Sequence, residues 1–148
     1  MADERWLTSE ALDLMSHQWH ERILVIMEDL SKWTHLRYAF AIGRDGIQLT
    51  HPIGPKGTIL DEKAYSHEIF HHLALTVEEY LVNIEHPAPA YVTIELEHEL
   101  LFVASTGAVY LVASFEDVVE RGYMSMKLKK RIAHLRNVSQ QYDRGRVG

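Results

Sequence analysis

The sequence predicts a small α+β sandwich: a five-stranded antiparallel sheet with the first and last helices on one face and the second helix on the other. Two observations carry this prediction. Helical amphipathic patterns and period-2 patterns follow one another in the order helix, strand, strand, helix, strand, strand, strand, helix. In addition, residues 37–50 resemble a hairpin, because Arg44, Asp45 and Gly46 supply turn chemistry between two alternating stretches.

Residues 9–33 are expected to form the first helix, with Ser9 as its N-cap. The apolar residues of this segment recur at spacings of three and four and therefore share one helix face. They are Leu12, Met15, Trp19, Ile23, Ile26, Leu30 and Trp33. The hairpin follows. Its first strand alternates the bulky Tyr38, Phe40 and Ile42 with small residues, and its second strand begins at Ile47.

The second helix is expected over residues 62–84, capped by Asp61, after a loop over residues 51–60 that holds two prolines and two glycines. The loop lacks the spacing of a nucleotide phosphate loop. The apolar stripe of the helix is Tyr65, Ile69, Leu73, Val77, Tyr80 and Ile84, widened by Phe70, Ala74 and Leu81. So broad an apolar arc predicts packing against two surfaces, the sheet and another subunit.

Three strands and a final helix complete the prediction. The strands are expected over residues 91–97, 100–105 and 109–115, and the last of them is apolar on both faces, which is typical of a central strand. The helix is expected over residues 122–142. Its stripe is Met124, Leu128, Ile132, Leu135 and Val138. Residues 143–148 are expected to be disordered.

The composition predicts one globular domain over residues 1–148, with a core at about 9–140. The chain has 148 residues, of which 47% are hydrophobic. It contains no cysteine, which excludes disulfides, thiolate metal ligands and cysteine nucleophiles. No apolar run approaches the ~20 residues of a membrane span, and the N-terminus lacks the apolar core of a secretory signal. A cytoplasmic location is therefore expected.

Charge is distributed unevenly along the chain. The net charge is −6, and 8 of the 15 basic residues lie after Glu116, together with only 3 of the 21 acidic ones. A basic final helix on an acidic body could attract phosphate or an acidic partner. We favour a solvated helix face and no nucleic-acid binding, because no aromatic stacking pattern accompanies the charges. The basic residues concerned are Lys127, Lys129, Lys130, Arg131 and Arg136.

A literal H-E-x-x-H motif occupies residues 67–71. In zinc peptidases this spacing places two histidines one helical turn apart on the metal, with the glutamate activating water. Here His67 and His71 lie at the polar edge of the predicted helix, and no distal ligand stands out. We expect these histidines to be solvated or to lie in an interface. Incidental metal binding by the pair is the second choice, and zinc-dependent hydrolysis is the third.

The glutamates at 95, 97 and 99 alternate as on a solvated strand face.

Three segments resemble the Roadblock family of dynein light chains and bacterial small-GTPase regulators. RYAFAIGRDGIQLTH resembles the first hairpin of the family, and LLFVASTGAVYLVASFEDVVERGYMSM resembles its last two strands and the entry to the final helix. KLKKRIAHLRNV resembles the closing basic helix. Together with the helix between them, these segments cover roughly residues 9–140, in the order that the family shows.

The resemblance implies a Roadblock-like (profilin-like) sandwich that forms a homodimer and has no catalytic residues and no cofactor. Family members pair through the third strand and the second helix, here residues 91–97 and 62–84. The implied dimer contacts are Leu73, Val77, Leu81, Val92 and Ile94. Bacterial members bind a Ras-like small GTPase across the paired second helices. The implied partner contacts are Phe70, His71, Ala74, Leu75 and Glu78, on the free flank of that helix.

Two alternatives from other classes remain open at the level of the sequence. One is a zinc-dependent hydrolase that uses His67, Glu68 and His71. The other is a small-ligand-sensing domain of related topology, which requires a cavity between the sheet and a helix.

Overall fold

The structure, a computed structural model, describes residues 3–14, 17–61, 65, 67–85, 90–106 and 108–147. Its elements are η1 (Glu4–Trp6), α1 (Ser9–Leu14), α2 (His17–Ser31), β1 (Leu36–Gly43), η2 (Pro55–Gly57), α3 (His67–Asn83), β2 (Ala90–Leu96), β3 (Glu99–Ser105), β4 (Val109–Glu116) and α4 (Arg121–Val147). The strands form an antiparallel sheet in the order β1-β4-β3-β2.

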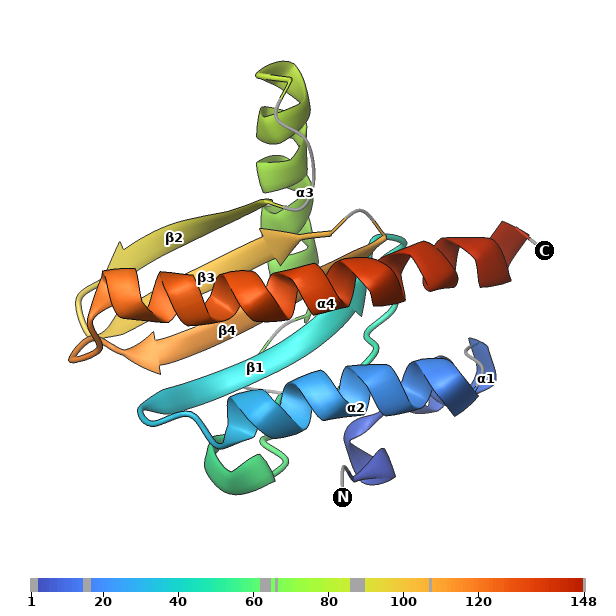
Figure 1. Cartoon of the computed structure of the whole chain (residues 1–148), viewed down its shortest axis with the longest axis horizontal. Helices are drawn as coiled ribbons and strands as arrows, with labels where there is room; N and C mark the ends of the chain where they lie inside the picture. The colour runs from blue at the N-terminus through green and yellow to red at the C-terminus, as the bar shows by residue number, and fades with distance from the viewer. Residues whose placement is uncertain are drawn as a thin grey trace.

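The sheet lies between two helical layers, as the sequence predicts. Helices α2 and α4 cover one face and α3 covers the other (Figure 1). The alternation in β1 assigns its side chains to these layers. Ala39 and Ala41 face α2, where their small size leaves room for the helix, while Tyr38, Phe40 and Ile42 face α3. Strand β4 is buried from Val109 to Phe115 and lies inside the sheet, which confirms its predicted central place.

The prediction of five strands is wrong, because the described sheet has four. The expected second strand, residues 47–50, makes only isolated bridges with its neighbours. The Ala41 amide donates to the Thr50 side-chain oxygen at 2.9 Å. In a regular strand pair, this amide would donate to a backbone carbonyl of the neighbouring strand instead. Pro52 follows and has no backbone N–H to donate. The ladder therefore resumes only at Ile53, which exchanges two backbone hydrogen bonds with Ala39.

Several helix boundaries differ from the prediction. The segment expected as one helix over 9–33 is described as α1 and α2, and Met15 and Ser16 lie outside the described residues. Helix α3 begins at His67, so Asp61 is not its N-cap. Helix α4 continues to Val147, past the predicted end at 142, so residues 143–147 are helical rather than disordered. Arginine favours helix, and one internal glycine weakens a helix without ending it. None of the described helices is long and apolar enough to cross a membrane.

Candidate interaction surface on α3 and the edge strand β2

Helix α3 packs on the sheet through a face that shares only part of its predicted stripe. Ala74 is 1% exposed, and the Phe70 ring meets the Phe40 ring edge-on, with 5.1 Å between centroids. Leu73 and Val77 of the predicted stripe pack in the same layer. Ile69, Tyr80 and Ile84 are 69%, 59% and 51% exposed and lie on the part of the broad apolar arc that does not contact the sheet. Neighbouring positions on a helix lie about 100° apart, so a helix that is apolar on two flanks can rotate either one towards the sheet.

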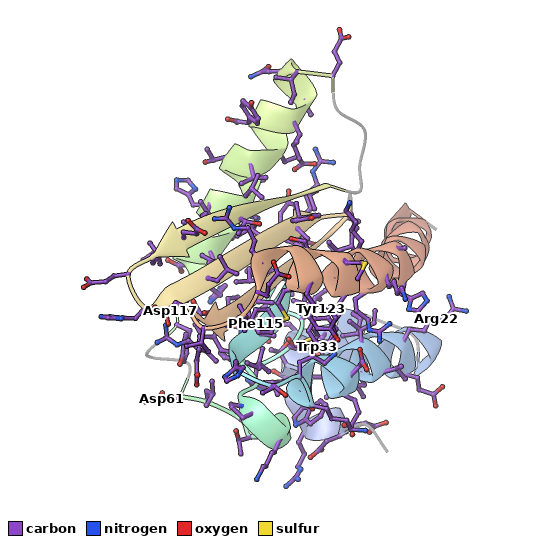
Figure 2. All side chains as sticks on the ribbon, turned by 60° about the vertical axis from the view of Figure 1, so that its left-hand side comes forward. Arg22, Trp33, Asp61, Phe115, Asp117 and Tyr123 are labelled. Carbon is purple, nitrogen blue, oxygen red and sulfur yellow. The ribbon has the colours of Figure 1, made fainter. Side chains whose placement is uncertain are left out.

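The exposed part of α3 extends past the sheet. The helix crosses behind the strands, and its C-terminal half extends beyond β2 (Figures 1 and 2). Strand β2 is the last strand of the sheet, so its outer edge has no partner strand within the described chain. Val92 and Ile94 on this strand are half-buried against the α3 layer. An unpaired strand edge and an apolar helix flank therefore occur at the same side of the molecule.

A polar network holds α3 to the turn after β1. The Tyr110 hydroxyl donates a hydrogen bond to the Glu78 carboxylate, and Arg44 Nε lies 3.4 Å from the same carboxylate. His71 Nε2 donates to the Arg44 carbonyl oxygen at 2.8 Å. Gly46 completes the contact: it has φ = 93°, and a Cβ there would lie 3.3 Å from His71 Cε1. Burial raises the pKa of the Tyr110 hydroxyl above its usual range, and the bond to Glu78 adds to that rise.

These contacts correct part of the predicted partner surface. Phe70 and Ala74 face the sheet and do not lie on the free flank of the helix. Leu75, His71 and Glu78 lie half-buried on the flank beside the Arg44 turn. Their role as partner contacts remains a prediction, and so do the implied dimer contacts. Among the latter, Val77 is buried, whereas Leu73, Leu81, Val92 and Ile94 are half-buried.

The three alternating glutamates do not form one solvated strand face. Glu99 belongs to β3, and its side chain is only 16% exposed. It accepts hydrogen bonds from the Ser114 hydroxyl and, at 2.8 Å, from the Tyr38 hydroxyl. Burial and the bond to Glu99 raise the pKa of Tyr38 above its usual range. Glu95 forms an ion pair with Arg121. The edge strand therefore carries less uncompensated negative charge than the sequence indicates.

Solved structures share this architecture. The gliding protein MglB from Thermus thermophilus superposes with a TM-score of 0.69 at 18% identity, over 86% of this chain and 96% of that one. Myxococcus xanthus MglB superposes with a TM-score of 0.68 at 16% identity, over 86% of this chain and 94% of that one. A Roadblock/LC7 domain from Streptomyces avermitilis superposes with a TM-score of 0.59 at 19% identity, over 80% of this chain and 94% of that one. The chain has the Roadblock/LC7 fold. No protein-family model matches its sequence, and neither does any curated protein.

The H-E-x-x-H segment opens α3 of this Roadblock/LC7 fold. His71 uses Nε2 for its hydrogen bond to the Arg44 carbonyl, which leaves only Nδ1 for a ligand. In the part of the chain that the structure describes, no three His, Cys, Asp or Glu side chains come together as a metal site. The hydrolase alternative therefore gains no third ligand from the fold.

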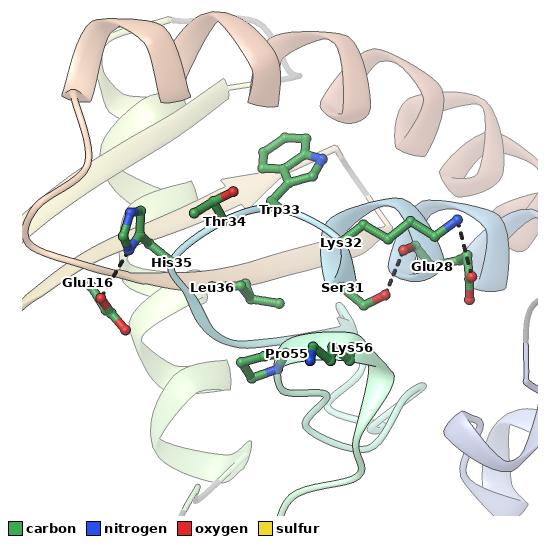
Figure 3. A pocket seen from close by; sticks show the side chains of 10 residues that line it. All are labelled: Glu28, Ser31, Lys32, Trp33, Thr34, His35, Leu36, Pro55, Lys56 and Glu116. Atoms are coloured by element: carbon green, nitrogen blue, oxygen red, sulfur yellow. Dashed lines mark hydrogen bonds and ion pairs between the residues drawn. The ribbon is translucent and has the colours of Figure 1, made fainter.

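A hollow of about 670 Å³ lies where α2 ends and β1 begins, next to η2 (Figure 3). Four of its side chains form two close pairs. Lys32 Nζ lies 3.4 Å from a Glu28 carboxylate oxygen, and His35 Nδ1 lies 3.1 Å from Glu116 Oε2. The C-terminal end of α2, the first residue of β1, the last residue of β4 and η2 line the hollow. It therefore lies at the end of these strands and is not the cavity between sheet and helix that a ligand-sensing domain requires.

Two basic residues of α4 pack inward rather than forming a fully solvated face. Lys127 Nζ lies 4.2 Å from the centroid of the Trp33 ring, and Arg131 forms an ion pair with Asp29 of α2. One helical turn separates them, so both point towards α2. Figure 2 shows Trp33 close to Tyr123, below α4. Lys129 and Lys130 are exposed as predicted, while the side chain of Arg136 lies outside the described residues.

Proposed function

We propose that this protein is a non-enzymatic, homodimeric, cytoplasmic scaffold that binds a Ras-like small GTPase and modulates its cycle. The observation that carries the proposal is the superposition on two MglB proteins over at least 94% of their chains. Three sequence segments independently resemble the same family, whose bacterial members regulate small GTPases.

The homodimer is supported by the free edge of β2 together with the part of α3 that extends beyond it. A second copy placed about a two-fold axis would pair its own β2 with this edge and cover the exposed Tyr80 and Ile84. Like charges opposite each other would oppose such pairing, but the ion pair between Glu95 and Arg121 reduces that cost. One MglB was solved with a tetrameric arrangement, so association of this fold has a precedent.

The GTPase contact is proposed on the α3 flank beside the Arg44 turn, at His71, Leu75 and Glu78. The network of Glu78, Arg44 and Tyr110 fixes this flank relative to the sheet, and a fixed flank can position a partner's loops at little entropic cost. Phe70 and Ala74 contribute indirectly, because they pack α3 against the sheet.

The test is GTP hydrolysis by Ras-like GTPases of the same organism, with and without the full chain. We expect a change in the hydrolysis rate of one GTPase at saturating chain. The change should be lost in Leu75→Glu and retained in Val118→Glu, a matched substitution at a residue that is 67% exposed and far from α3 in the sequence. The proposal would be contradicted if the chain left the hydrolysis rate of every such GTPase unchanged and bound none of them in either the GDP or the GTP state.

A further inference from the structure

A groove of about 430 Å³ follows the flank of α3 that faces the Arg44 turn. Its lining consists of Arg44, Leu75, Glu78, Glu79, Val82 and Asn83. Leu75 and Val82 are seven residues apart and lie one above the other along the helix. Val82 is 66% exposed and Leu75 is half-buried, so the groove has an apolar wall that is open to solvent.

The polar side of the groove favours a cation. The Glu78 carboxylate is shared by Tyr110 and Arg44, whereas Glu79 is exposed and has no ion-pair partner among the described residues. The two carboxylates outnumber the single guanidinium of the lining. The groove also lies at the C-terminal end of α3, where the helix carbonyls carry partial negative charge and the last turn holds no basic residue.

We propose that this groove receives a lysine or arginine side chain from the surface of the GTPase partner, an inference that rests on the proposed function. Long basic side chains bury their methylene stems on apolar surface while the charged head stays at the rim. The stem would lie along Leu75 and Val82, and the head would pair with Glu79. The groove continues the flank on which the partner contacts are predicted, so one docked protein would cover both.

The test uses an arginine probe, so that it does not depend on finding the GTPase. The full ¹⁵N-labelled chain is titrated by NMR with N-acetyl-arginine amide up to about 50 mM, and separately with the uncharged analogue N-acetyl-citrulline amide. We expect saturable amide shifts at Leu75, Glu79 and Val82 with the arginine probe only. Because exposed ion pairs are weak, Glu79→Gln should weaken probe binding about three- to fivefold. Glu68→Gln, which removes an exposed carboxylate from the other end of α3, should leave probe binding unchanged.

Four results would overturn the proposal: no saturable shift, equal shifts with both probes, shifts confined to other elements, or unchanged probe affinity in Glu79→Gln. A lower solution mass of Glu79→Gln would also overturn it, because a second copy would then occupy the groove. The two proposals fail separately. A GTPase that binds the chain equally well with and without Glu79 refutes only the groove. Specific arginine binding without any GTPase partner refutes the proposed function, and with it the GTPase as the source of the side chain, but not the preference of the groove for a basic side chain.

Discussion

Removing the Tyr110 hydroxyl tests whether burial determines the strength of the anchor between α3 and the sheet. In Tyr110→Phe, the Glu78 carboxylate loses its O–H donor at a position where the Glu78 side chain is only 16% exposed. Hydrogen bonds to charged groups contribute about 1.5–3 kcal/mol, so we expect the free energy of unfolding to fall by about 2 kcal/mol. Arg44 contacts the same carboxylate, but its side chain is 62% exposed. Its pair with Glu78 should contribute less than about 1 kcal/mol.

Double-mutant cycles separate the two partners of Glu78. Tyr110→Phe and Arg44→Ala are each combined with Glu78→Ala, and the free energy of unfolding is measured in urea. Protein concentration is held fixed, because the stability of a dimer depends on it. We expect the Tyr110 coupling to exceed the Arg44 coupling by at least about 0.5 kcal/mol. A Tyr110 coupling below about 0.3 kcal/mol, or a larger Arg44 coupling, would refute the reasoning.

Three further outcomes are expected from urea unfolding. Burial raises the pKa of Tyr110 and of Tyr38, so the unfolded chain releases these protons first and the free energy of unfolding should fall as pH rises above about 10. Tyr110→Phe should make the free energy of unfolding fall less steeply with pH. Tyr80→Phe, at an exposed position, should leave that slope unchanged, and equal slopes in the two variants would contradict the prediction. Glu85 has φ = 57° just after α3, so Glu85→Gly should raise the free energy of unfolding by about 0.5–1 kcal/mol, and a decrease would contradict the assigned conformation. Phe40 is 0% exposed, so Phe40→Ala should cost about 3–5 kcal/mol, and a cost below about 1 kcal/mol would contradict its place in the core.

The two faces of β1 could be predicted because they depend on local periodicity, whereas the placement of the helices on them agrees with the family resemblance. Alternation along β1 correctly separated the bulky side chains that face α3 from the small ones that face α2. The four-strand sheet could not be predicted in the same way. Residues 47–50 carry a strand pattern, and the interruption depends on a hydrogen bond from the Ala41 amide to the Thr50 side chain.

The candidate surface could be predicted only in part. The sequence indicates that α3 is apolar over too wide an arc for one contact, but not that Phe70 faces the sheet while the adjacent Ile69 faces solvent. That choice depends on how Phe70 packs against Phe40. The contact between Tyr110 and Glu78 joins residues 32 positions apart and leaves no local pattern. Glu79 and Val82 were not among the predicted contacts, although the seven-residue spacing from Leu75 to Val82 marks one helix face.

The most direct test of the proposed function is the light-scattering mass of the chain, alone and mixed with a Ras-like GTPase held in its GTP state. One chain has a mass of 17.1 kDa. The account predicts about twice that mass for the protein alone, and a rise by the mass of one GTPase in the mixture, because one partner spans the paired α3 helices. A mass of 17.1 kDa at every concentration, with no rise on adding any GTPase, would contradict it.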